Sequence, residues 1–246
     1  MTMRQALREG KKFFFQNIRS LKAFVFDLDG TLINTFEVYL HSLNEGLKAF
    51  GLPPISSKKL TEFLNQATPL EEILKRVAPS KFTDTRTRLS CVEKIKKAYF
   101  SALEKVKLLN GAPELLFTLK DKGFKVGIVT GRTTRGEEKW LELKRLGIAE
   151  FVDVFVTGFE APRKPSSGGI RTCIKELGVS PEEAILVGDS EADALASKEA
   201  GIPFIGVATG VGKKQKLLAL GALYVFQDLR ELLKMVKRLD TFNPLE

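Results

Sequence analysis

The chain has 246 residues, of which 43% are apolar and 28% are charged. This is the composition of a globular protein that buries a core, so an intrinsically disordered chain is excluded. The two cysteines, Cys91 and Cys173, lie far apart and outside any CxxC spacing. They argue against a disulfide framework and a zinc site, and we expect a reducing, cytoplasmic location. The apolar runs are far shorter than the ~20 residues that a membrane-spanning helix needs.

The net charge of +9 favours anionic partners, which include phosphorylated metabolites, nucleic acid and anionic lipid. Lysines and arginines are spread along the whole chain, and the sequence carries no signature of a nucleic-acid-binding module. Nucleic acid is therefore a disfavoured partner, and solvated helix faces explain most of the charge.

The chain changes character near residue 22. Residues 1–21 form a basic segment with apolar residues at loosely helical spacing, and we expect it to dock on the core or to lie on another surface. Residues 22–35 begin the core. Their apolar run Ala23–Phe26 ends at an Asp-rich turn that contains glycine, which predicts a buried central strand.

Residues 36–108 are predicted to be helical throughout. One apolar stripe at helical period opens this stretch, and it consists of Phe36, Leu40, Leu43, Leu47 and Phe50. Gly51 and Pro53 end the first helix. The stretch has the length of a small domain, roughly 70 residues. We therefore expect a helical domain inserted between the first and second strands of the core.

Residues 109–246 are predicted to alternate strands with helices. The predicted strands are 125–129, 152–156, 184–187, 203–206 and 224–226. The predicted helices lie near 113–122, 137–146, 169–177 and 192–200, and a last helix closes the core near residue 239. This alternation predicts right-handed βαβ units, and hence an α/β fold with a Rossmann-like parallel sheet covered by helices on both faces.

Four polar segments lie at or beyond the carboxyl ends of predicted strands, where sheets of this kind bind their ligands. They are Asp27-Leu28-Asp29-Gly30-Thr31, Thr130-Gly131-Arg132, Lys164-Pro165 and Gly188-Asp189-Ser190-Glu191-Ala192-Asp193. A carboxylate can attack phosphorus and form an aspartyl-phosphate, and Asp27 is the candidate nucleophile. Asp27 and Asp189 can bind the Mg²⁺ that neutralises the phosphate charge.

The remaining groups suit the other requirements of phosphoryl transfer. Asp29 can protonate the leaving oxygen and later take a proton from water. Thr130, the backbone N–H groups from Gly131 onward and Lys164 can hold the phosphoryl oxygens. Arg132 lies beside this phosphate site, and its guanidinium suits a second anionic group.

In their order and positions these segments resemble the four motifs of the haloacid dehalogenase superfamily. The resemblance implies that Asp27 is the nucleophile and Asp29 the general acid/base. It implies that the Asp29 backbone carbonyl and the Asp189 side chain bind Mg²⁺. It implies further that Thr130 and Lys164 bind phosphate, and that Asp193 supports the metal or Lys164.

The helical insertion resembles the cap of the phosphoglycolate phosphatase-like branch, which closes over the site and selects the substrate. True dehalogenases lack the second aspartate of the first motif, so Asp29 favours phosphoryl chemistry. We therefore expect a Mg²⁺-dependent phosphatase that hydrolyses a small phosphomonoester, with a small phosphorylated metabolite as its partner.

Two alternatives stay open at this point. A phosphomutase of the same superfamily would use the same groups to pass the phosphoryl group to a sugar instead of water. A non-catalytic protein, which is an alternative from another class, would use the basic residues 1–21 to hold nucleic acid or anionic lipid.

Overall fold

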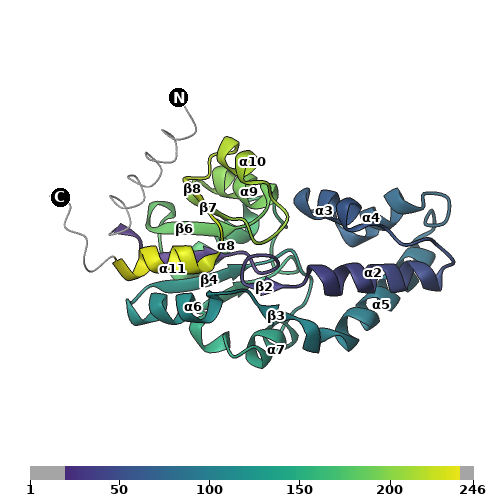
Figure 1. Ribbon diagram of the computed structural model, residues 1–246, viewed down its shortest axis with the longest axis horizontal. Coiled ribbons are helices and arrows are strands. Elements are labelled where there is room, and N and C mark those ends of the chain that lie inside the picture. The colour runs from purple at the N-terminus through teal and green to yellow at the C-terminus, as the bar shows by residue number, and fades with distance from the viewer. Residues whose placement is uncertain (1–19, 239–246) are drawn as a thin grey trace.

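The computed structural model describes residues 20–238, which form a sheet-containing body with a helical lobe beside it (Figure 1). The strands are β1 (Ala23–Phe26), β2 (Ile33–Asn34), β3 (Lys107–Leu108), β4 (Lys125–Val129), β5 (Val154–Val156), β6 (Ala184–Gly188), β7 (Phe204–Val207) and β8 (Tyr224–Phe226). The helices are α2 (Phe36–Ala49), α3 (Ser57–Asn65), α4 (Leu70–Val77), α5 (Thr85–Ser101), α6 (Ala112–Asp121), α7 (Glu138–Arg145), α8 (Gly168–Leu177), α9 (Glu191–Ala200), α10 (Lys214–Ala219) and α11 (Leu229–Lys237). Each helix within residues 20–238 is too short or too polar to cross a bilayer. The predicted basic segment, residues 1–21, lies outside the described residues except for its last two.

The main sheet of the described chain has six parallel strands in the order β5-β4-β1-β6-β7-β8. β1 lies in the middle, where Phe26 pairs with Ile128 of β4 on one side and with Val187 of β6 on the other. The strand order reverses at β1, and a ligand crevice opens at the carboxyl ends of strands at such a reversal. The predicted α/β fold with a Rossmann-like parallel sheet is confirmed.

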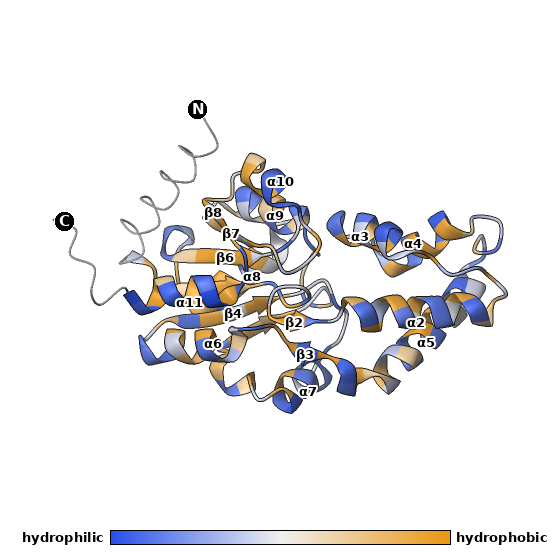
Figure 2. Cartoon of the chain, in the orientation of Figure 1, coloured by the Kyte–Doolittle hydropathy of each residue, from blue (hydrophilic) through white to orange (hydrophobic). Residues whose placement is uncertain are grey.

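Alternate residues of β1 face opposite layers of helices, as a parallel sheet covered on both faces requires. Phe24 and Phe26 belong to an apolar cluster with residues of α6, α7 and α11. Ala23 and Val25 belong to a second cluster with residues of α8, α9 and α10. All four side chains are fully buried, and the strands are predominantly apolar in Figure 2. The buried sheet thus fixes the places of the polar residues that follow its strands.

Helices α2 to α5 form the lobe, which has an apolar core of its own (Figure 1). That core consists of Leu43, Leu47, Leu60, Phe63, Ile73, Leu74, Phe82, Cys91, Val92 and Ile95. α2 and α5 pack closely, because a Cβ added to Gly46 would lie only 2.2 Å from Cγ1 of Ile95. The lobe is therefore a packed unit and not a long loop.

The lobe joins the core through a two-stranded antiparallel ribbon of β2 and β3. Ile33 pairs with Leu108, and Asn34 pairs with Lys107. The prediction of helix throughout residues 36–108 is therefore wrong at its end, where residues 107–108 form a strand. The chain leaves the core after β2 and returns at β3, and pairing between these two segments satisfies backbone groups that a helix end would leave open.

Gly127 provides a test of how tightly the sheet packs on its helices. A Cβ at this β4 position would lie 2.3 Å from Sγ of Cys173 and 3.1 Å from Cδ1 of Leu177, both on α8. Gly127→Ala should lower the free energy of unfolding in urea by about 1–3 kcal/mol through overpacking. Because Cys173→Ala removes the sulfur that the new methyl group meets, the double variant should lose less than the sum of the single losses. Strictly additive losses would contradict this account of the contact.

Candidate active site

The turn after β1 brings Asp27 and Asp29 to the carboxyl edge of the sheet. The carbonyl of Leu28 accepts hydrogen bonds from the N–H groups of Leu32 at 3.0 Å and Ile33 at 3.1 Å, which closes the turn. Gly30 has a φ of +90°, and a Cβ there would lie 2.9 Å from Oδ2 of Asp189. Both the backbone conformation and the space favour glycine at this position. The sequence Asp-Gly-Thr thus forms a tight turn against the end of β6.

Lys164 lies between two carboxylates at the centre of this edge. Its Nζ pairs with Oδ1 of Asp27 and, at 2.6 Å, with Oδ1 of Asp193, and it donates to the carbonyl of Val129 at 3.0 Å. All three charged side chains are buried. Burial opposes the charge on Lys164, but the neighbouring Asp193 and Asp27 carboxylates outweigh it and raise its pKa. The ammonium is therefore a fixed positive charge in the site.

The Asp27 carboxyl lies in a cluster of like charges. Burial raises its pKa well above the usual value, Lys164 opposes this rise, and Asp193, Asp189 and Asp29 add to it. One ammonium does not balance these carboxylates, so the position of Asp27 favours a further cation.

Asp189 follows β6 and faces the Asp27 turn. Its Oδ1 accepts a hydrogen bond from Oγ1 of Thr31 at 3.1 Å, and its Oδ2 accepts one from the N–H of Val211 at 2.8 Å. A Cβ at Gly210 would lie 1.8 Å from Oδ2, so the loop after β7 closes tightly over this carboxylate. Burial and the neighbouring Asp193 raise the pKa of Asp189 to about 7.

Asp193 combines two tasks at the start of α9. It forms a capping box with Ser190, whose N–H donates to Oδ2 of Asp193 at 2.9 Å, while Oγ of Ser190 accepts from the N–H of Asp193 at 3.2 Å. Its other oxygen pairs with Lys164. The capping box therefore fixes the carboxylate of Asp193 that pairs with Lys164.

Three carboxylates of this edge could share a metal ion. Oxygen atoms of Asp27, Asp189 and Asp193 all lie within 4.8 Å of one another. Buried carboxylate oxygens are the donors that Mg²⁺ prefers, and the excess of negative charge calls for a cation. Lys164 pairs with Oδ1 of Asp193 and the N–H of Ser190 donates to its Oδ2, whereas Lys164 contacts Asp27 through Oδ1 alone. Asp27 and Asp189 therefore stay the predicted side-chain ligands of the ion. The residues present therefore fit Mg²⁺.

The Asp29 side chain turns toward Arg132. Its Oδ1 accepts from Nη2 of Arg132 at 2.6 Å and from Oγ1 of Thr35 at 2.8 Å. Its Oδ2 accepts from Nε of Arg132 at 2.8 Å and from Oγ1 of Thr130 at 3.4 Å. Burial raises the pKa of Asp29, but the Arg132 guanidinium outweighs burial and lowers it. Asp29 thus pairs with Arg132, whereas Asp27 pairs with Lys164.

Thr130 and Gly131 follow β4 between these two groups. Thr130 is buried, its N–H donates to the carbonyl of Val156 at 3.0 Å, and its Oγ1 accepts from the N–H of Arg132 at 3.3 Å. A Cβ at Gly131 would meet open space, so the backbone is accessible on this side. The structure thus brings all eight predicted site residues to one edge of the sheet.

The lobe reaches this edge through Asn65 at the end of α3. The side-chain amide of Asn65 donates to Oε1 of Glu191 at 3.1 Å, and its carbonyl oxygen accepts from the N–H of Glu191 at 3.2 Å. Glu191 begins α9, two residues after Asp189. The lobe therefore touches the core directly beside the carboxylate cluster.

Thr31, Thr35 and Glu142 also contact these residues, although they are not among the predicted site residues. Thr31 belongs to the same motif as Asp27, and its contact with Asp189 could have been anticipated from that motif. Glu142 is a buried acidic residue on α7 that pairs with Arg132, and no local pattern marks it.

Fold and site together define an α/β protein that carries a carboxylate cluster where the strand order of its parallel sheet reverses. The model of the haloacid dehalogenase-like hydrolases matches residues 24–207. A Clostridium perfringens protein with the provisional name pyrophosphatase PpaX is 33% identical over 223 residues, which cover 90% of this chain and 100% of that protein. The phosphoglycolate phosphatase of Rhodospirillum rubrum is 30% identical over 221 residues, covering 86% and 89%.

Solved structures show the same fold. A haloacid dehalogenase-like hydrolase from Streptococcus pneumoniae superposes with a TM-score of 0.74 at 24% identity, covering 88% of this chain and 99% of that one. The chain therefore belongs to the haloacid dehalogenase-like hydrolase family, as the resemblance of its motifs predicts.

The raised pKa of Asp189 predicts a pH-dependent stability in the absence of divalent cations. Between about pH 4 and about pH 7 the Asp189 carboxyl binds more protons in the folded protein than in the unfolded chain, so the contribution of Asp189 to stability should fall as the pH rises through this window. Asp189→Asn should flatten that fall in urea unfolding curves, and Mg²⁺ at pH 7 should stabilise the wild type more than the variant. The exposed Asp121→Asn, at the end of α6, is the control. Identical pH profiles for wild type and Asp189→Asn would contradict this account.

Proposed function

We propose that this protein is a Mg²⁺-dependent phosphatase, which hydrolyses a small phosphomonoester through an aspartyl-phosphate on Asp27. The observation that carries the proposal is the convergence of Asp27, Lys164 and Asp189 at one edge of the sheet. The relatives named phosphoglycolate phosphatase and pyrophosphatase support phosphoryl-transfer chemistry.

In the first step a carboxylate oxygen of Asp27 attacks phosphorus, and the bond from phosphorus to the leaving oxygen breaks. Asp27 and Asp189 would hold the Mg²⁺ together with the backbone carbonyl of Asp29, as the family resemblance implies. When bound, the ion supplies positive charge that lets the anionic phosphate approach the nucleophile. Lys164 supplies a second positive charge at a fixed place, and Asp193 supports it from behind.

Asp29 serves as the general acid/base. It protonates the leaving oxygen in the first displacement, and in the second it takes a proton from the water that attacks the aspartyl-phosphate. Thr130, the backbone N–H groups near Gly131 and Lys164 would hold the phosphoryl oxygens in both steps. Because these donors are already in place, little reorganisation accompanies the transfer of charge.

The helical lobe would act as a cap over this edge. Its contact from Asn65 to Glu191 lies beside the carboxylate cluster, so closure would exclude water from the site and bring lobe side chains near the leaving group. A substrate of the size of phosphoglycolate or pyrophosphate is the class that the relatives' names suggest.

The proposal predicts that Asp27→Asn abolishes hydrolysis of p-nitrophenyl phosphate in the presence of Mg²⁺. Removal of a nucleophile should lower kcat by at least about a thousandfold. Asp121→Asn is the matched control, and circular dichroism checks that both variants fold. Full activity in Asp27→Asn would refute the assignment, and so would Mg²⁺-independent turnover by the wild type.

A panel of phosphorylated metabolites defines the substrate class. Phosphoglycolate, sugar phosphates, nucleotides and pyrophosphate should be compared by kcat/KM with the wild-type protein. Turnover in ¹⁸O-labelled water separates the phosphatase from a phosphomutase, since only hydrolysis places the label in inorganic phosphate. Absence of Asp27-dependent turnover, together with a salt-sensitive complex with nucleic acid, would favour the non-catalytic alternative instead.

A further inference from the structure

Arg132 has a second carboxylate partner behind Asp29. While Nε and Nη2 bind the two oxygens of Asp29, Nη1 pairs with Oε2 of Glu142 on α7. The side chain of Glu142 is buried, with 8% of it exposed. A buried carboxylate without a partner would be strongly destabilising, so Glu142 and Arg132 depend on each other.

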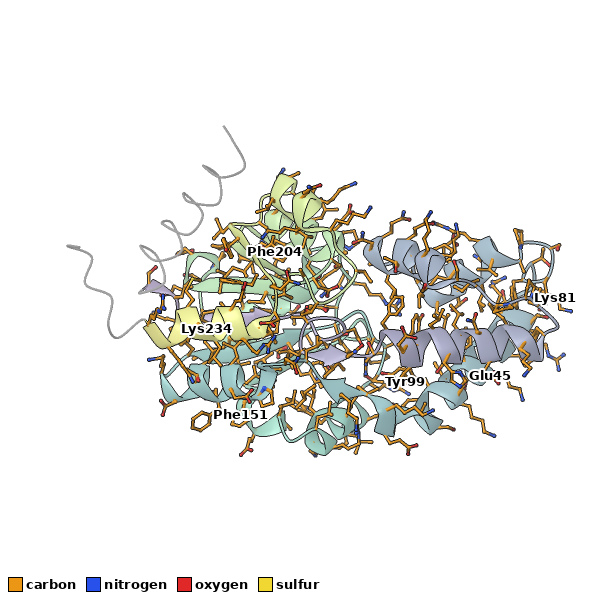
Figure 3. The ribbon with its side chains drawn as sticks, in the orientation of Figure 1. Glu45, Lys81, Tyr99, Phe151, Phe204 and Lys234 are labelled. Atoms are coloured by element: carbon orange, nitrogen blue, oxygen red, sulfur yellow. The ribbon has the colours of Figure 1, made fainter. Side chains whose placement is uncertain are left out.

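Tyr99 contributes a third contact from the helical lobe. Its hydroxyl accepts from Nη2 of Arg132 at 2.7 Å and donates to Oε1 of Glu142 at 3.4 Å. The guanidinium also lies over the Tyr99 ring, 5.4 Å from the ring centroid. Tyr99 belongs to α5 and packs against the apolar core of the sheet, at the end of the lobe nearest that core (Figure 3).

These contacts leave the planar guanidinium little freedom. Its donors point in fixed directions, and they meet Asp29 on one side and Glu142 with Tyr99 on the other. Arg132 is therefore held by both the core and the lobe. The role of Arg132 in binding the substrate stays a prediction, and in this arrangement two carboxylates and the Tyr99 hydroxyl engage its guanidinium.

We propose that Glu142 and Tyr99 are positioning residues, which hold Arg132 so that it fixes the Asp29 carboxylate for its task as general base. This inference rests on the proposed function. In the second displacement, water attacks phosphorus, its proton passes to Asp29, and the bond from phosphorus to Asp27 breaks. Two hydrogen bonds from Arg132 fix the Asp29 carboxylate in the orientation that accepts the proton of this water. A freely rotating carboxylate would adopt that orientation less often. Tyr99 makes this alignment depend on the place of the lobe.

Glu142→Gln and Tyr99→Phe should slow the second displacement more than the first. An aryl phosphate has a good leaving group that needs little help from an acid, so kcat/KM for p-nitrophenyl phosphate should stay within about threefold of the wild type. The kcat should fall at least about tenfold, since general-base catalysis contributes about a hundredfold or more. KM should fall in parallel, and rapid mixing should reveal a burst of nitrophenol that approaches the enzyme concentration.

Glu138→Gln is the matched control, because Glu138 lies one turn earlier on α7 and is exposed. It should show neither the burst nor the fall in kcat. Chemical rescue gives a second readout: guanidinium ion should restore the kcat of Arg132→Ala, and it should not restore that of Arg132→Ala combined with Glu142→Gln. Tyr99→Phe keeps the aromatic ring, and it provides the same test if Glu142→Gln fails to fold.

The outcomes separate cleanly. A fall in kcat and kcat/KM together without a burst would overturn the positioning role. A raised KM at unchanged kcat would do so too, and would assign Arg132 to substrate binding. Rescue by guanidinium in the absence of Glu142 would also overturn it. If the wild type shows no Asp27-dependent turnover at all, the proposed function fails and not this inference alone.

Discussion

The buried ammonium of Lys164 is the interaction on which the rest of the site depends. It pairs with Asp27 and Asp193, while Asp189 adds a third carboxylate within reach of a shared ion. With Asp29 there are four aspartates in the site, and their negative charges repel one another at such short range. Each of these carboxylates accepts at least one hydrogen bond or ion pair from a neighbouring group. One ammonium and one guanidinium leave an excess of negative charge, which is the condition under which a divalent cation binds.

The parallel sheet explains how residues so far apart in sequence reach this arrangement. β1 lies between β4 and β6, so the turns that follow these three strands emerge side by side. Two glycines without room for a side chain, Gly30 in the turn after β1 and Gly210 in the loop after β7, let the backbone close on the Asp189 carboxylate. The lobe leaves the core at the same edge and meets it again there, through Asn65 on one side and Tyr99 on the other. The carboxyl edge of the sheet is thus where the strands end, where the charged side chains gather and where the lobe contacts the core.

The sequence predicts much of the core, because its strands are apolar runs bounded by glycine and polar turns. The predicted bounds of β1, β4 and β8 are those observed, and the strand-end rule anticipates which segments meet. The β2–β3 ribbon escapes prediction, since two residues per strand show no period. The contacts of Arg132 escape it as well. Tyr99 and Glu142 lie 43 residues apart on helices whose relative placement only the packed lobe determines, so no local pattern links them. Which way the Asp29 side chain turns likewise depends on these distant partners.

The proposed mechanism depends most on Asp27, whose carboxylate oxygen receives the phosphoryl group. The most direct measurement is to quench the protein during turnover of a phosphate ester with Mg²⁺, reduce the acyl phosphate with borohydride and locate the modification by peptide mass spectrometry. The account predicts modification of residue 27, its absence in Asp27→Asn, and its accumulation when the second displacement is slowed. Modification at another residue would contradict this mechanism. So would a nitrophenol burst during which the quenched protein carries no modification.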